Sequence, residues 1–194
     1  MNSVLMRLLA AVTVALAAMS ANAQAVEVEG VKLDPTAQVG GAALQLNGAG
    51  VRTRAIFKVY VAGLYVPQKA NSAAALLAQK GPRRVAITML RNVDADTFSG
   101  ALTEGLQKNL SEAQFTGFKA QIDALTANFK AAGEAKKGDV IHLEFVPDTG
   151  TRVIVNGKPS GAAIPGEDFY TAVLRIWLGD KPVDGDLKKG LVGG

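Results

Sequence analysis

The segment of residues 46–66 constrains the fold of this chain more than any other. It opens with the run Leu46-Asn47-Gly48-Ala49-Gly50-Val51-Arg52, whose glycines allow a sharp turn. From Val51 onward the residues predict a long strand or a bent pair of strands, since successive side chains point to opposite faces. One face is apolar and the other mixes cations with apolar residues: Arg52, Arg54, Ile56, Lys58, Tyr60, Ala62, Leu64 and Val66. Such a face fits either a cleft for an amphipathic molecule or a sheet half covered by helices.

The first 23 residues have the pattern of a secretory signal peptide. Arg7 is their only charge, residues 8–18 form an apolar run, and residues 21–23 form a small-x-small cleavage site. The run is shorter than the roughly 20 apolar residues that span a bilayer. We therefore expect cleavage after Ala23, export to a bacterial periplasm, and no integral membrane segment in the remaining single domain, residues 24–194.

Composition argues against several kinds of chemistry. The chain has no cysteine and one histidine, so thiol catalysis is excluded and a zinc site is disfavoured. The Lys and Arg residues behind the formal charge of +4 are scattered, which gives no support to nucleic acid binding. No catalytic-serine, dinucleotide or P-loop motif occurs. We expect neither metal nor cofactor, and His142 beside Glu144 fits either a general base or a half-exposed residue with a cross-strand partner.

The order of the predicted elements indicates an α+β fold. Strands are predicted over residues 26–33 with a bend at Gly30, and over 42–46, 83–90, 139–146 and 151–155, with an Asn156-Gly157 turn leading to one more. Helices are predicted over residues 73–79, 94–110, 111–129 and 167–178, and around Leu187 and Leu191. Ser111 and Gln114 form a capping box for the third helix, whose apolar stripe should pack it against the sheet.

Several short motifs resemble the chalcone isomerase superfamily, in particular its secreted bacterial branch. They are G-A-G-x-R at residues 48–52, K-x-x-x-x-G-x-Y at 58–65, L-R-N-V-D-A-D-T-F at 90–98, and residues 169–179. The resemblance implies an antiparallel sheet with helices layered on one face, an open-faced β-sandwich, and a ligand cleft between the sheet and the helices. The superfamily contains both isomerases and non-catalytic fatty-acid binders, so the fold leaves both functions open.

The resemblance also assigns candidate site residues. Arg52 matches the family arginine, and Tyr60 stands where the family has a threonine. Phe98 replaces a tyrosine and so lacks its hydroxyl, while the family asparagine falls near Gly105, which has no amide. The Ser/Thr of the late helix falls at Tyr170 or at the adjacent Thr171. The expected ligand-binding residues are therefore Arg52, Tyr60, Phe98 and Tyr170.

These replacements favour binding over chalcone isomerisation. Ring closure on an enone needs a cluster of donors around the developing enolate, and phenylalanine and glycine cannot supply them. Arg52 can still hold a carboxylate or a phenolate through its planar fork. We expect a periplasmic binder of a small amphipathic carboxylate such as a fatty acid. One alternative is an isomerase of the intramolecular lyase type that uses Arg52 and Tyr60 on an unknown substrate. Another is an envelope interaction protein whose own side chains close the cleft.

Overall fold

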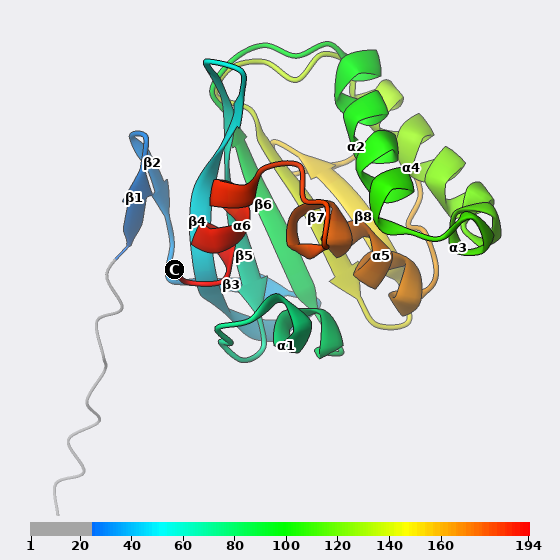
Figure 1. The fold of residues 1–194 in the computed structure, drawn as a ribbon, viewed down its shortest axis with the longest axis horizontal. Helices are drawn as coiled ribbons and strands as arrows, with labels where there is room; N and C mark the ends of the chain where they lie inside the picture. Colours follow the sequence, from blue (N-terminus) through cyan, green and yellow to red (C-terminus); the bar gives the residue numbers. More distant parts are fainter. Residues whose placement is uncertain (1–24) are drawn as a thin grey trace, which may run out of the picture.

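A seven-stranded antiparallel sheet forms the centre of the molecule. The computed structural model describes residues 25–194, so the expected signal peptide lies outside the described residues. The strands lie in sequence order from β3 to β9 (Figure 1), and a two-stranded hairpin, β1 and β2, precedes them. Their bounds are β1 Val26–Val28, β2 Val31–Leu33, β3 Thr36–Val39, β4 Ala42–Arg54, β5 Phe57–Val66, β6 Arg83–Met89, β7 Val140–Val146, β8 Gly150–Val155 and β9 Lys158–Pro159.

The helices lie on one face of this sheet (Figure 1), which confirms the expected α+β fold with layered helices. They are α1 Ala73–Ala78, α2 Ala95–Asn109, α3 Glu112–Gly117, α4 Lys119–Ala132, α5 Glu167–Leu178 and α6 Gly185–Leu191. The larger core lies between the helices and the sheet, and its centre is α5, whose Phe169 and Trp177 are fully buried. A smaller cluster on the opposite face includes Leu33 of β2 and Val61 of β5.

The segment after Val51 is an antiparallel hairpin. β4 ends at Arg54 and β5 begins at Phe57, so the chain reverses through Ala55 and Ile56. Ala55 has a φ of 54°, a conformation that glycine usually provides in such a turn. No glycine or proline marks the reversal, which is why the sequence pattern reads as one long or bent strand. Arg52 and Tyr60 nevertheless share a face, because they are cross-strand partners.

The expected turn at Gly48–Gly50 is wrong, because both glycines lie inside β4. Helix α6 crosses this strand at backbone distance. A Cβ atom at Gly48 would overlap the carbonyl oxygen of Gly190, and one at Gly50 would press on Leu187. The glycines therefore let α6 pack directly on the strand that carries Arg52.

Three local predictions in the second half of the chain have different outcomes. The capping box is present, with Ser111 accepting from the backbone N–H of Gln114 and the Gln114 side chain accepting in return. The single helix expected after it is broken at Phe118 into α3 and α4. The Asn156-Gly157 turn is confirmed, with positive φ at both residues and β9 directly after it.

Candidate ligand-binding cleft

An open cleft of about 370 Å³ lies between the β4–β5 hairpin and helix α2. Its walls are largely apolar and include Val59, Phe98, Leu102, Ile176 and Val183. Polar side chains come from the hairpin, the β6–α2 loop and the first turn of α2: Arg52, Arg54, Tyr60, Arg91, Asn92, Asp94 and Thr97. The volume is within the range of about 300–1,000 Å³ that is typical of small-molecule sites. The molecule's own side chains thus leave the cleft open.

The charge of Arg52 lies at this cleft. Among the described residues it takes part in no ion pair, and its Nε atom is buried without a hydrogen-bond partner. Its guanidinium carbon lies 5.9 Å from the centre of the Tyr60 ring, which gives a weak cation–π contact. The guanidinium charge therefore has no ion-pair partner among residues 25–194 and is available to an anion that enters the cleft.

Tyr60 also lines the cleft and carries a second donor, its hydroxyl. Trp177 Nε1 donates to it over 2.9 Å, so one of its lone pairs is occupied. Burial raises the pKa of Tyr60 to about 12, and the nearby Arg52 charge offsets only part of this shift. The hydroxyl therefore keeps its proton at neutral pH, and no acceptor for that proton lies within hydrogen-bond distance among residues 25–194.

The structure also explains the two missing family donors. Phe98 lines the cleft, and its ring packs on Phe129 with 5.1 Å between ring centres. Gly105 does not line the cleft, and a Cβ atom there would overlap Ile176 of helix α5. An asparagine at position 105 would have no room, because α2 and α5 pack closely at this point.

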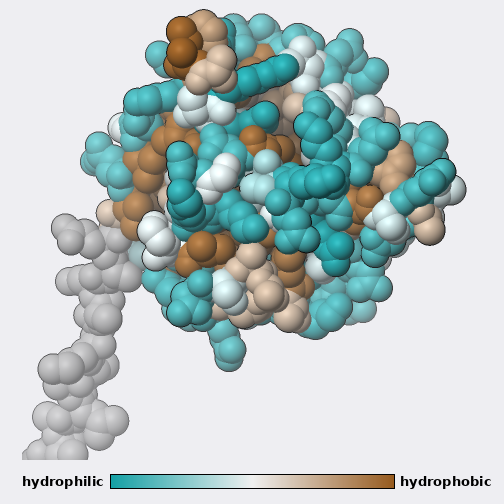
Figure 2. Space-filling model, in the orientation of Figure 1, coloured by the Kyte–Doolittle hydropathy of each residue, from teal (hydrophilic) through white to brown (hydrophobic). Residues whose placement is uncertain are grey.

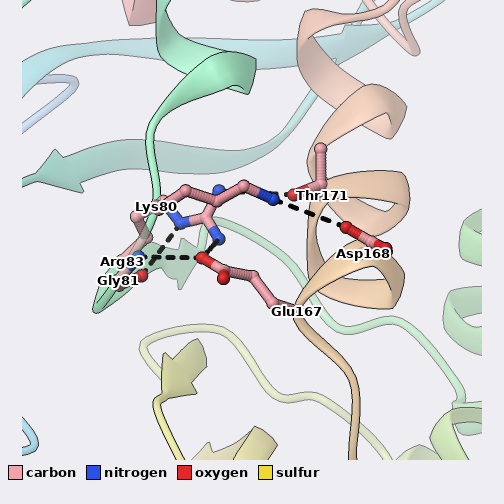
Figure 3. A network of polar contacts seen from close by, with 6 residues as sticks. All are labelled: Lys80, Gly81, Arg83, Glu167, Asp168 and Thr171. Atoms are coloured by element: carbon pink, nitrogen blue, oxygen red, sulfur yellow. Dashed lines mark hydrogen bonds and ion pairs between the residues drawn. The ribbon is translucent and has the colours of Figure 1, made fainter.

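Tyr170 lies apart from the cleft. It is fully buried, and its hydroxyl donates to the carbonyl oxygen of Leu143 over 2.9 Å. The Arg83 guanidinium carbon stands 5.3 Å from the Tyr170 ring, and Arg83 also donates to the Thr171 hydroxyl (Figure 3). Of the residues that the resemblance selects, Arg52, Tyr60 and Phe98 are brought together. Neither Tyr170 nor Thr171 joins them.

Sequence reasoning missed Trp177 and Arg91. Trp177 is the only tryptophan of the chain and follows Tyr170 by about two helical turns. It therefore lies on the same face of α5, farther along the helix, and reaches Tyr60. Arg91, which lines the cleft, lies within the family-like L-R-N motif, a signal that could have selected it.

His142 and Glu144 belong to a structural cluster away from the cleft. Arg84 Nε and Arg152 Nη2 each donate to the buried Glu144 carboxylate over 2.7 Å. His142 Nδ1 lies 3.8 Å from the same carboxylate. Burial and, next, the Arg84 charge hold the pKa of His142 below its usual value. The half-buried histidine is thus neutral at pH 7 and borders an ion-paired carboxylate.

Two further observations concern residues 25–194 only. No group of three His, Cys, Asp or Glu side chains is placed to hold a metal ion. None of the helices in this range has both the length and the hydropathy required to cross a bilayer.

Comparison with known proteins agrees with the fold. The model of the chalcone isomerase-like family matches residues 25–193, and the chain therefore belongs to that family. Among solved structures it resembles a fatty-acid binding protein of Arabidopsis thaliana, with a TM-score of 0.65 and 15% identity over 87% of this chain and 96% of that one. A sequence search of curated proteins gives no significant match.

Proposed function

We propose that this protein binds a small amphipathic carboxylate, such as a fatty acid, with its head group at Arg52. The single observation that carries the proposal is the buried, unpartnered Nε of Arg52 in a largely apolar cleft. A partly buried charge costs free energy unless it is paired. A bound carboxylate would supply that pair, and its alkyl tail would lie along Val59, Phe98 and Leu102.

The Tyr60 hydroxyl supports the same ligand class. Because Trp177 occupies one lone pair, the Tyr60 proton remains for an acceptor, and a carboxylate has two oxygens to receive Tyr60 and Arg52 together. The Arabidopsis neighbour is described as a fatty-acid binding protein. It supports this ligand class through a shared fold.

Binding would take place in the periplasm if the N-terminal pattern acts as a signal peptide. This part of the proposal rests on Arg7, the apolar run of residues 8–18 and the small residues at 21–23. N-terminal sequencing of the exported protein should give Gln24 as its first residue. A membrane-retained form that keeps residues 1–23 would contradict it.

The affinity for acids tests the binding proposal. Medium- and long-chain fatty acids are titrated by calorimetry into wild type, Arg52→Met and Arg52→Lys, with the emission of Trp177 as a second readout. A charge-assisted hydrogen bond contributes about 1.5–3 kcal/mol. Arg52→Met should therefore weaken binding by roughly 10–150-fold, and Arg52→Lys by less, because it keeps the charge but not the fork.

Arg175→Met is the matched control, because it removes the same charge from a residue that does not line the cleft. It should bind acids like wild type. If wild type binds no acid, the proposal is wrong. If Arg52→Met binds as tightly as Arg175→Met, the head group lies elsewhere.

A second candidate function is an isomerase acting on an enone other than a chalcone. It is favoured by the two donors, Arg52 and Tyr60, which line one cleft and could stabilise an enolate oxygen. A screen of enones should then find turnover that both Arg52→Met and Tyr60→Phe reduce by about 10²–10³. Chalcone itself should not turn over appreciably, because Phe98 and Gly105 provide no donor.

A further inference from the structure

The tip of the β4–β5 hairpin exposes two large apolar side chains next to each other. Ile56 is 85% exposed and Phe57 is 53% exposed. In the described part of the chain only Val26, at 42%, joins them as an exposed large hydrophobic residue. A pair of this kind costs solvation free energy in water, so its position points to a surface that covers it.

The tip lies at one end of the sheet. In Figure 1 the end of the hairpin rises above the other strands, and helix α2 and the loops beside it reach a similar height; Figure 2 shows a brown and tan patch at the same place, beside a largely teal surface. Ala55 holds the turn with a φ of 54°, a conformation that is unfavourable for a residue with a Cβ atom. The apolar pair is thus presented at the turn of a two-stranded hairpin.

Two arginines flank the tip. Arg54 and Arg91 are exposed and take part in none of the ion pairs of residues 25–194, and the Arg91 guanidinium carbon lies 4.5 Å from the Phe57 ring centre. Lys137 belongs to the same end of the sheet, because its backbone N–H donates to the Asn92 side chain.

The carboxylates at this end already have partners. Asp94 caps α2 through the Thr97 N–H. Glu134 accepts from Asn92, and Asp139 accepts from the Lys136 N–H and from Asn156. These hydrogen bonds come from neutral donors, so the carboxylates keep their charge. The cations nearest the apolar pair are Arg54, two residues before Ile56, and Arg91, whose guanidinium stands over the Phe57 ring.

We propose that this tip docks on a bilayer that contains anionic phospholipid. Ile56 and Phe57 would enter the boundary between head groups and acyl chains, while Arg54 and Arg91 would contact lipid phosphates. An apolar pair flanked by two arginines complements a surface that is anionic outside and apolar beneath. A protein partner would need an acidic rim around an apolar pocket, whereas an anionic bilayer offers both features everywhere.

Docking would also bring the mouth of the cleft to the membrane. Arg54, Phe57 and Arg91 belong to the tip and line the cleft as well. An amphipathic acid could then pass between the bilayer and the cleft without crossing water. This passage rests on the proposed function, whereas the docking does not.

Co-sedimentation with vesicles, without added fatty acid, tests the docking. The vesicles are made of phosphatidylcholine alone or mixed with phosphatidylglycerol. Wild type should bind the mixed vesicles and release at high salt. Ile56→Ser should weaken binding by roughly fivefold or more, since most of this side chain would be buried on insertion. The double variant Arg54→Gln/Arg91→Gln should weaken it by roughly 25-fold, at about fivefold for each arginine.

Val26→Ser is the matched control, because it removes the other exposed apolar side chain, on β1. It should bind vesicles like wild type. The docking proposal is overturned if wild type does not bind the mixed vesicles. It is also overturned if Val26→Ser binds them as weakly as Ile56→Ser. Self-association that Ile56→Ser abolishes, measured by sedimentation velocity, would overturn it as well if no vesicle binding occurs, and would assign the tip to a second copy.

The acid titration separates this inference from the proposed function. Ile56 does not line the cleft, so Ile56→Ser should bind fatty acids in solution with the affinity of wild type. If wild type binds fatty acids but not vesicles, only the docking proposal is contradicted. Vesicle binding without acid binding removes the proposed function and leaves the docking.

Discussion

Two arginine–tyrosine pairs in this molecule are treated in opposite ways. Arg83, at the start of β6, is fully buried and stands over Tyr170, with 5.3 Å between its guanidinium carbon and the ring centre. Arg52, on β4, stands over Tyr60 at 5.9 Å. Both tyrosines are buried in the core between the sheet and the helices. The comparison therefore involves the same two residue types, with different burial of the arginine and different partners.

The Arg83 pair is closed. Its guanidinium donates to the Gly81 carbonyl, the Thr171 hydroxyl and the Glu167 carboxylate, the last over 2.8 Å (Figure 3). The Tyr170 proton goes to a backbone carbonyl. Every strong donor of this pair serves the fold.

The Arg52 pair is open. Neither its buried Nε nor the Tyr60 proton has an acceptor among residues 25–194. The difference teaches that burial of an arginine beside a tyrosine does not by itself indicate a site. Unused donors on two neighbouring residues that line one cleft are the better sign of a site.

The largest effect should come from the closed pair. Arg83→Met should lower the free energy of unfolding by about 3 kcal/mol, near the low end for breaking a buried ion pair, because the Glu167 carboxylate is partly exposed and can be rehydrated. Urea unfolding measures the change. The folded fraction should keep its affinity for acids, since Arg83 does not line the cleft. Lost acid binding at full folding would show that the two pairs are coupled.

The buried tyrosines should make the fold sensitive to alkali. The Tyr60 pKa rises from about 10 in the unfolded chain to about 12. The contribution of this proton to the free energy of unfolding is complete below pH 10. It is lost as the pH rises from 10 to 12, because Tyr60 then loses its proton in the unfolded chain but keeps it in the folded protein. The loss should reach about 2–3 kcal/mol by pH 12. Burial also raises the pKa of Tyr170, which adds to it.

Unfolding free energies between pH 9 and 12 check this sign. Tyr60→Phe should show a shallower decline than wild type, and Arg52→Met a steeper one, because the Arg52 charge holds the Tyr60 pKa down in part. An unchanged pH dependence in Tyr60→Phe would mean that this hydroxyl is solvated.

Much of the fold follows from local patterns in the sequence. In three segments the residue types themselves specify the local structure, and the corresponding elements form where expected: the capping box of Ser111, the Asn156-Gly157 turn and the apolar face of residues 167–178. The turn through Ala55 and Ile56 has no such residue types. Gly48 and Gly50 are ambiguous, since a glycine serves a turn and a close approach equally well, and only the distant helix α6 decides between them.

The site was predictable only in part, because its geometry also depends on contacts between segments that are distant in the sequence. Arg52 and Tyr60 do share a face, but through cross-strand pairing and not along one strand. Tyr170 and Trp177 lie on one face of α5, and only the tilt of that helix over the sheet decides which of them reaches Tyr60. No periodicity within the helix contains that information.

A smaller effect, on the affinity for fatty acids, should follow from replacing Trp177, which donates to the Tyr60 hydroxyl. Trp177→Phe removes the donor to the Tyr60 hydroxyl, so the hydroxyl is no longer held with its proton free for the ligand. The affinity for fatty acids should fall by roughly 3–10-fold, or about 0.5–1.5 kcal/mol. Calorimetry measures it, since this variant has no tryptophan.

Tyr60→Phe provides the control for a direct effect of Trp177. In a double-mutant cycle, Trp177→Phe/Tyr60→Phe should bind no more weakly than Tyr60→Phe alone, because both changes remove one interaction. Additive losses would instead indicate that Trp177 shapes the cleft by packing.

The smallest effect should be that of Arg52→Met on stability. No ion pair or hydrogen bond is lost, and methionine keeps much of the apolar stem. Removing a partly buried, unpartnered charge recovers desolvation free energy, which offsets the lost cation–π contact of about 0.5–1 kcal/mol. The free energy of unfolding should therefore change by less than about 0.5 kcal/mol, as measured by urea unfolding beside Arg83→Met. If Arg52→Met were as destabilising as Arg83→Met, both arginines would serve the fold and the contrast between the two pairs would disappear.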